Sequence, residues 1–255
     1  MPHNPDILAD SLCSRSYDKN TTLCSHVRGE SLQVILYQKV PAEAALQAEI
    51  ASLREVDQAA VGSSRGERLI LWEAESPCVV IPRTGTLETH LLRPAQPCVP
   101  VYRRESGGAA VLLGPGCLNY AVVVSLRQRP DFADVEYSYG AILEILVRSL
   151  RVGSARVIGS DLALGDRKFG GHAQRRTRYA LLHHGTILYD FDLGLMDRIL
   201  EMPARRPAYR GERRHGEFLP NLTLTLNDLL GRFEDFARRM TSGKSTKTTR
   251  CDQAR

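Results

Sequence analysis

Closely spaced cysteine pairs are absent from this chain of 255 residues. Without a C-x-x-C motif, the sequence offers neither a zinc knuckle nor a thioredoxin-like redox site, and it identifies no metal ligand. We therefore expect mostly free thiols and a reducing, cytoplasmic location. The six cysteines lie far apart along the chain, at Cys13, Cys24, Cys78, Cys98, Cys117 and Cys251.

Long hydrophobic runs are missing as well. No apolar stretch approaches the length needed to cross a bilayer. The start of the chain, MPHNPDILAD, is polar and contains two prolines, which is unlike the apolar core of a secretory signal. These two absences predict a protein without a membrane partner.

A strong excess of one charge is also lacking, since 34 Lys and Arg residues face 29 Asp and Glu residues, giving a formal net charge of +5. Part of the excess lies in residues 241–255 and part in the arginine-rich run 205–214. A generic basic surface explains this pattern more simply than a dedicated nucleic-acid face, so we expect no nucleic-acid partner.

The chain divides into three parts by composition. Residues 1–31 are polar and lack a sustained period, which predicts a flexible N-terminal extension. Residues 32–240 carry the hydrophobic segments and predict one folded, catalytic-size domain. Residues 241–255 contain no core-forming pattern and predict a disordered basic tail.

The order of predicted elements indicates an α+β fold. Short β-rich segments occur at 32–38, 68–74, 77–83, 99–104, 118–126, 156–171 and 178–191, without strict βαβ alternation. A helix after Pro41 places Leu46, Ile50 and Leu53 on one face, with Glu43 and Glu49 away from it. A second helix runs from about Asp134 to Arg151 and ends near Gly153, and helices near 193–200 and 226–240 close the fold. We predict a mixed, mainly antiparallel sheet flanked by helices.

Three short segments could carry chemistry. The first is the small-residue loop R-R-E-S-G-G-A-A-V, where glycines let backbone N–H groups approach an anion and two arginines add positive charge; a glycine-rich hairpin without a ligand is equally compatible. The second is Lys168, between the Gly165-Asp166 turn and a Gly-Gly pair, where a fixed cation could face charge developing on phosphorus; a solvated turn lysine is the simpler interpretation for any single lysine. The third is His183-His184-Gly185-Thr186, whose adjacent histidines point to opposite faces of a strand and so form no metal pair.

Taken together, the order RRxSGG, then DRKFGGHAQ, then HHGTIL resembles the lipoate–protein ligase family within the biotin/lipoate ligase superfamily. The likeness covers roughly residues 32–240, and the stretch MPARRPAYRGERRHGEF resembles a variant seen in plant-type ligases. The resemblance implies that the enzyme activates lipoate or octanoate with ATP and Mg²⁺ and transfers the acyl group to a lysine. The implied acceptor is a lipoyl domain of an E2 subunit or of the glycine-cleavage H-protein type.

The resemblance also implies residue roles. Lys168 would be the catalytic cation that contacts the acyl carboxylate and the α-phosphate, and Asp161 would lie near the adenosine. His184, Gly185 and Thr186 would border the acyl pocket. The ATP and acyl-adenylate would be held by Arg104, Ser106, Gly107, Gly108, Ala109, Ala110, Val111, Leu112, Asp161 and Lys168.

Some positions depart from the family pattern. Ala109 replaces the third glycine of the loop, Leu113-Gly114 replaces His-Asp, and Cys117 follows Gly116 where the family has asparagine. The chain is also too short for the accessory C-terminal domain of larger bacterial ligases, which implies a separate accessory subunit or none.

Three alternatives remain at this stage. An octanoyltransferase of the same fold would take the acyl group from an acyl-carrier protein through a cysteine thioester. Cys117 lies beside the loop, but it begins an apolar strand, and we expect it to be dispensable. A biotin ligase would need a GRGRxGR-type loop, which is absent. A non-catalytic acyl- or protein-binding homologue is the third alternative, against which the presence of Arg104 and Lys168 argues.

Overall fold

A computed structural model describes residues 23–25, 32–60, 66–93 and 98–242 of the chain. Most of the predicted N-terminal extension and basic tail lies outside these residues. The part of 1–31 that is described is the strand β1 (Leu23–Ser25), which pairs with β2 (Gln33–Val40). This segment therefore has regular structure where the sequence predicted none.

An eight-stranded sheet in the order β1-β2-β3-β7-β11-β10-β9-β8 forms the centre of the described fold. Only β2 and β3 pair in parallel, and the other neighbours are antiparallel. The predicted α+β fold with a mainly antiparallel sheet is confirmed. The remaining strands of this sheet are β3 (Arg68–Ala74), β7 (Cys117–Ser125), β8 (Ala155–Ile158), β9 (Asp161–Leu164), β10 (Arg167–Arg176) and β11 (Ala180–Leu188).

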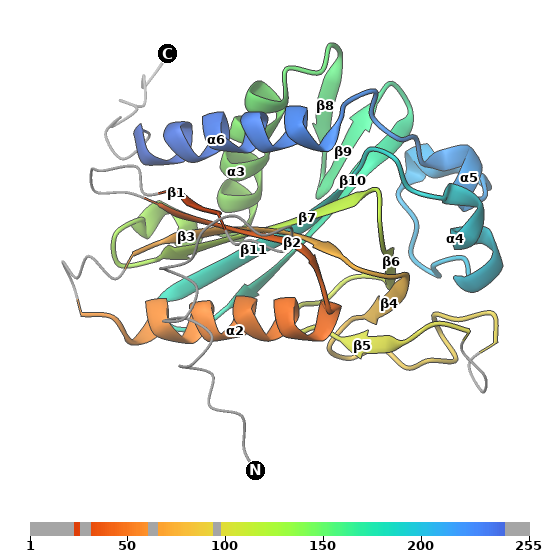
Figure 1. Cartoon of the computed structure of the whole chain (residues 1–255), viewed down its shortest axis with the longest axis horizontal. Helices are drawn as coiled ribbons and strands as arrows, with labels where there is room; N and C mark the ends of the chain where they lie inside the picture. The colour runs from red at the N-terminus through yellow and green to blue at the C-terminus, as the bar shows by residue number, and fades with distance from the viewer. Residues whose placement is uncertain (1–22, 26–31, 61–65, 94–97, 243–255) are drawn as a thin grey trace, which may run out of the picture.

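Helices cover both faces of this sheet (Figure 1). Helix α2 (Ala42–Gln58) packs on β7 and β11 from one side, and α3 (Val135–Leu150) and α6 (Leu226–Ser242) pack together on the other. Strand β7 is buried along its whole length because alternate side chains enter the two cores: Tyr120 and Val122 face α3 and α6, whereas Ala121 and Val123 face α2.

A smaller sheet and two short helices stand at one end of the large sheet (Figure 1). Strand β4 (Cys78–Ile81) lies between β5 (Val101–Arg103) and β6 (Val111–Leu113). Helices α4 (Leu193–Ile199) and α5 (His215–Phe218) pack against each other nearby. The two short 3₁₀ turns are η1 (Pro130–Ala133) and η2 (Ala208–Arg210).

Helix α3 spans Val135–Leu150 with caps at Asp134 and Arg151, which confirms the helix predicted from about Asp134 to Arg151. Asp134 caps its N-terminus by accepting a hydrogen bond from the Tyr137 N–H (2.7 Å), as expected for an aspartate before a helix. Its C-terminal cap is Arg151, in the left-handed conformation with φ 51°, and the cap N–H bonds to the Val147 carbonyl. The glycine at 153 is thus not the cap, because Arg151 already satisfies the last turn.

Candidate active site

The glycine-rich loop presents unused backbone donors. Residues 107–110 belong to the connection between β5 and β6, and none of their amide N–H groups donates to another group within the described part of the chain. Gly107, Gly108 and Ala109 are also exposed. A row of free N–H groups in a small-residue loop is the arrangement that binds phosphate or carboxylate.

Arg104 stabilises the conformation of this loop through hydrogen bonds to its carbonyl groups. Its guanidinium donates to the carbonyls of Gly107 (2.6 Å) and Ala109 (2.7 Å), and also to that of Val80 (3.1 Å). Because these carbonyls accept hydrogen bonds from Arg104, the N–H groups of the loop point away from the Arg104 side chain. Burial lowers the pKa of Arg104 to about 10, which still leaves the group charged at neutral pH. Arg104 organises the anion cradle in this structure, and its direct contact with ATP stays a prediction.

The alanine in place of the family's third glycine causes no backbone strain. Gly108 has φ +98°, a conformation that favours glycine. Among the described residues other than glycine, a positive φ occurs only at Lys39, Arg151 and Ser154. Ala109 therefore adopts an ordinary conformation, and the departure leaves the loop geometry intact.

A buried hydrogen-bond network connects the loop to helix α2. The Arg104 Nε–H donates to Ser106 Oγ (2.9 Å), and Ser106 Oγ is 2.7 Å from His184 Nε2. His184 Nδ1 lies 2.6 Å from Glu49 Oε2, and the Trp72 indole donates to Glu49 Oε1 (2.9 Å). The loop, two strands and a helix are thus joined by consecutive polar contacts inside the core.

Glu49 corrects the sequence interpretation of α2. The sequence placed this residue away from the core-facing side of the helix, but it is only 2% exposed. The buried stripe of the helix includes Ala42, Ala45, Leu53 and Val56, and Glu49 lies in it because its carboxylate is satisfied by Trp72 and His184. The signal available in the sequence was this alanine-rich stripe, since position 49 continues the helical spacing of Ala42 and Ala45.

Ser106, His184 and Glu49 have the connectivity of a hydrolase triad, but not its accessibility. A nucleophilic serine must reach a substrate carbonyl, whereas Ser106 is 1% exposed and lies beneath the loop. Its oxygen also accepts a hydrogen bond from Arg104. In this structure the three residues fix the loop on the sheet, and a contact of Ser106 with ATP stays a prediction.

Lys168 lies at the start of β10 in a second polar cluster. Its ammonium nitrogen is 2.6 Å from Asp161 Oδ1, and the Tyr209 hydroxyl donates to Asp161 Oδ2 (2.8 Å). A Cβ atom on Gly171 would lie only 2.8 Å from Lys168 Nζ, so the second glycine of the Gly-Gly pair leaves room for the lysine. Since an ammonium has three donors, the pair with Asp161 leaves Lys168 able to bind an anion.

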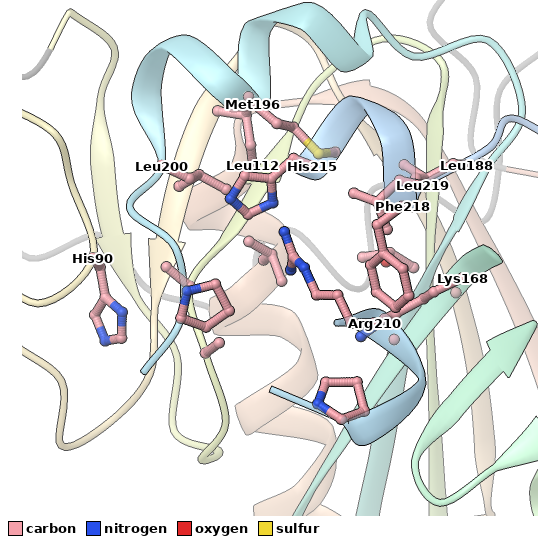
Figure 2. A pocket seen from close by; sticks show the side chains of 18 of the residues that line it. His90, Leu112, Lys168, Leu188, Met196, Leu200, Arg210, His215, Phe218 and Leu219 are labelled. Atoms are coloured by element: carbon pink, nitrogen blue, oxygen red, sulfur yellow. The ribbon is translucent and has the colours of Figure 1, made fainter. Parts of the chain in front are cut away.

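One cavity brings the loop and Lys168 together (Figure 2). Its volume is about 170 Å³. Residues 109–112 border it, as do Lys168 and Thr186. An apolar wall is supplied by the six residues Leu112, Leu188, Met196, Leu200, Phe218 and Leu219, all of which are labelled in Figure 2. A fixed cation, free amides and an apolar wall suit a ligand with an anionic and a nonpolar part.

The residues predicted for the acyl pocket do not all lie at the cavity. Thr186 borders the cavity, whereas His184 lies under the loop in the network with Ser106. His183 points to the other face, toward Tyr120 and Gln174, which confirms that the adjacent histidines face opposite sides of the strand. The assignment of His184, Gly185 and Thr186 to an acyl pocket stays a prediction.

Tyr209, Arg210 and His215 were not singled out from the sequence. They belong to the stretch 202–219, which contributes several side chains to the cavity. Tyr209 reaches Asp161, and Arg213 donates to Asp166 Oδ2 (2.8 Å) in the β9–β10 turn. These contacts hold the stretch over Lys168, and short-range sequence patterns cannot show such pairing across more than forty residues.

In the part of the chain that the structure describes, there is no group of three or more His, Cys, Asp or Glu side chains placed to hold a metal ion. Among the same residues, no helix combines the length and hydrophobicity of a membrane span.

Comparison with known proteins decides the family. Residues 41–242 match the lipoyl protein ligase A/B catalytic domain. The chain belongs to this family. A Schizosaccharomyces pombe relative, provisionally named lipoate-protein ligase A, is 30% identical over 146 residues, which cover 56% of this chain and 39% of the relative. A Plasmodium falciparum relative named inactive lipoate–protein ligase 2 is 37% identical over 62 residues, which cover 24% of this chain and 16% of the relative. The matched stretch thus spans less than half the length of either relative.

Solved structures of ligase-family proteins share the fold. A bi-partite lipoate protein ligase from Thermoplasma acidophilum, described together with its E2 lipoyl domain, has a TM-score of 0.65 at 20% identity, covering 83% of this chain and 84% of that one. A lipoate-protein ligase A bound with ATP has a TM-score of 0.63 at 19% identity, covering 83% of this chain and 86% of that one. At these identities, the likeness shows that the lipoyl ligase catalytic fold is present.

Proposed function

We propose that this member of the family is a lipoate–protein ligase. It activates lipoate or octanoate with ATP and passes the acyl group to a lysine of a lipoyl acceptor domain, of the E2 or glycine-cleavage H-protein type. The observation that supports this most is the cavity that the loop residues Ala109 and Ala110 share with Lys168. The structural relatives with bound ATP and with an E2 lipoyl domain point the same way.

The first step joins two anions. A carboxylate oxygen of the acyl chain attacks the α-phosphorus of ATP, the acyl-adenylate forms, and pyrophosphate leaves. Repulsion between the carboxylate and the phosphates is the main obstacle, so the useful groups are fixed positive charges and N–H donors. Lys168 and the amides of residues 107–110 are the groups of this kind that we assign to the step.

The second step needs little from the protein beyond positioning. The acceptor lysine attacks the acyl carbonyl, an amide forms, AMP leaves with the bonding electrons, and the amine gives up its extra proton. No cysteine intermediate is required. Holding the adenylate in a site that excludes water protects it from hydrolysis until the acceptor arrives.

Magnesium is expected to enter with the nucleotide. Mg²⁺ in phosphoryl-transfer sites is usually held by one or two carboxylates together with the substrate phosphates. Glu201 borders the cavity and is exposed, which suits that limited role. A separate accessory subunit stays a prediction.

The proposal predicts an ATP-dependent partial reaction. Purified protein incubated with ATP and Mg²⁺ should release pyrophosphate only when lipoate or octanoate is added. The assay is a coupled measurement of pyrophosphate, with the acyl chain omitted as the control. Release that is independent of the acyl chain would contradict acyl-adenylate formation.

Cys117 is predicted to be dispensable, in contrast to the octanoyltransferase alternative. Its thiol is fully buried at the start of β7, and burial together with the nearby Glu73 raises its pKa well above the ordinary value. A nucleophile needs the thiolate form and access to substrate, and this site provides neither. Cys117→Ala should retain most of the adenylation activity. An acyl group trapped on Cys117 in the wild-type protein, detected by mass spectrometry after reaction with an acyl-carrier thioester, would reverse this conclusion.

A further inference from the structure

The stretch 202–217 contains five arginines, of which three have acidic partners. The pairs are Arg206 with Glu212, Arg213 with Asp166 and Arg214 with Asp197. Within the described residues, no carboxylate lies within ion-pair distance of the other two, Arg205 and Arg210. These two are also the arginines that border the cavity.

Arg210 is a buried cation, only 5% exposed. Its Nε–H donates to the Arg213 carbonyl (3.0 Å), and one terminal nitrogen lies 3.2 Å from the Met202 sulfur, which is a weak acceptor. The guanidinium carbon is 4.9 Å from the centre of the Phe218 ring. Burial of a guanidinium is costly when no carboxylate offsets its charge. An anionic ligand bound beside Arg210 would offset that charge.

His215 lies next to Arg210 on the cavity wall and has one unsatisfied ring nitrogen. The residue is 7% exposed, and its Nε2 atom is buried without a hydrogen-bond partner among the described residues. Figure 2 shows the Arg210 side chain reaching into the cavity toward the His215 ring. Unpaired buried polar atoms are rare in folded proteins, and one that lies beside a buried guanidinium without a carboxylate partner indicates a binding site.

We propose that Arg205 and Arg210 form a subsite for the diphosphate part of a nucleoside triphosphate, which leaves the site as pyrophosphate. This inference rests on the proposed function. Lys168 lies in the same cavity and is already paired with Asp161, and Glu201 is the acidic residue on the cavity wall. The wall therefore carries an excess of positive charge.

The number of cations favours a diphosphate over a carboxylate as the occupant. A lipoate carboxylate carries one charge, which Lys168 and the loop amides can satisfy. The β- and γ-phosphates carry several charges and many acceptor oxygens, and arginine forks bind such oxygens in bidentate pairs. The contacts of Tyr209 with Asp161 and of Arg213 with Asp166 hold the arginine-bearing stretch in place for this role.

The test is calorimetric titration of the full chain with inorganic pyrophosphate in the presence of MgCl₂. Arg205→Ala and Arg210→Met should each weaken pyrophosphate binding by about 10-fold, the size expected for loss of one charge-assisted contact. Arg206→Ala is the matched control, because Arg206 lies in the same stretch but pairs with Glu212. The affinity of this variant for pyrophosphate should equal that of the wild type. Arg205 is exposed, so its alanine variant is expected to fold even if the Arg210 variant does not.

The outcomes separate this inference from the proposed function. Unchanged pyrophosphate affinity in folded Arg205→Ala and Arg210→Met, or an equal loss in Arg206→Ala, overturns the subsite. The subsite is also overturned if the two arginine variants lose affinity for lipoate in a titration but keep their affinity for pyrophosphate, since the arginines would then bind the acyl carboxylate. If pyrophosphate binds in an arginine-dependent manner but lipoate never stimulates pyrophosphate release, the subsite stands and the ligase proposal fails.

Discussion

Lys168→Ala is expected to reduce the rate of acyl-adenylate formation by roughly 100-fold or more, a loss comparable to removal of one preorganised electrostatic donor. Lys168 borders the same cavity as Ala109 and Ala110 of the loop, and we place the meeting of the carboxylate and the α-phosphate in this cavity. A compact ammonium in that position stabilises the charge that both groups share in the transition state. The measurement is lipoate-dependent pyrophosphate release under single-turnover conditions.

The folded state of this variant should be nearly unchanged. Lys168 is partly exposed, but Asp161 is buried and would keep only the hydrogen bond from Tyr209, so loss of the ion pair is expected to lower the free energy of unfolding by about 1–3 kcal/mol without changing the fold. Lys168→Arg should also be impaired, because a planar fork cannot replace a point charge in the space beside Gly171.

The control removes one positive charge far from the cavity. Arg148→Ala is suitable, because Arg148 is an exposed residue of α3 paired with Glu144. The neighbouring Arg167 is a poorer control, since its guanidinium donates to the Leu219 carbonyl (2.9 Å) and Leu219 borders the cavity. Near-normal adenylation by a folded Lys168→Ala protein would remove the catalytic role of the lysine.

Glu49→Ala is expected to cause the largest loss of stability. The Trp72 indole N–H and His184 Nδ1 would both be left without their carboxylate partner inside the core. Each buried donor without an acceptor costs about 1–3 kcal/mol, so the free energy of unfolding should fall by roughly 2–6 kcal/mol. Chemical denaturation of the variant and the wild type measures this difference.

Glu43→Ala is the matched control for this substitution. Glu43 lies on the exposed side of the same helix, and the change removes the same side chain. Its effect should stay within about 0.5 kcal/mol, the usual range for surface positions. Equal effects of the two substitutions would show that the network of Glu49, His184 and Ser106 does not stabilise the loop.

Local patterns in the sequence were sufficient for most of the fold. The apolar strands and the helix cap at Asp134 are set by side chains near in sequence, and the turn at Gly165 uses a positive φ that glycine adopts freely. The order of the loop, the lysine segment and the double-histidine strand also indicated the family.

The remaining features depend on contacts between distant residues. Glu49 looked like a surface residue of a helix, because its partners Trp72 and His184 come from strands far along the chain. The sequence suggested that the Arg104 guanidinium is free to bind phosphate, but its N–H groups donate to the Gly107 and Ala109 carbonyls of the loop. The placement of Arg210 depends on how residues 202–219 fold over Lys168, and no short-range periodicity describes that stretch.

The most direct test of the ligase proposal is mass spectrometry of a lipoyl acceptor domain after incubation with the protein, ATP, Mg²⁺ and lipoate. We predict a mass increase of one lipoyl group on the acceptor lysine, lost when ATP is omitted and strongly reduced with Lys168→Ala. Modification that proceeds without ATP from an octanoylated acyl-carrier protein, or no modification of any acceptor domain despite binding of lipoate, would contradict the account.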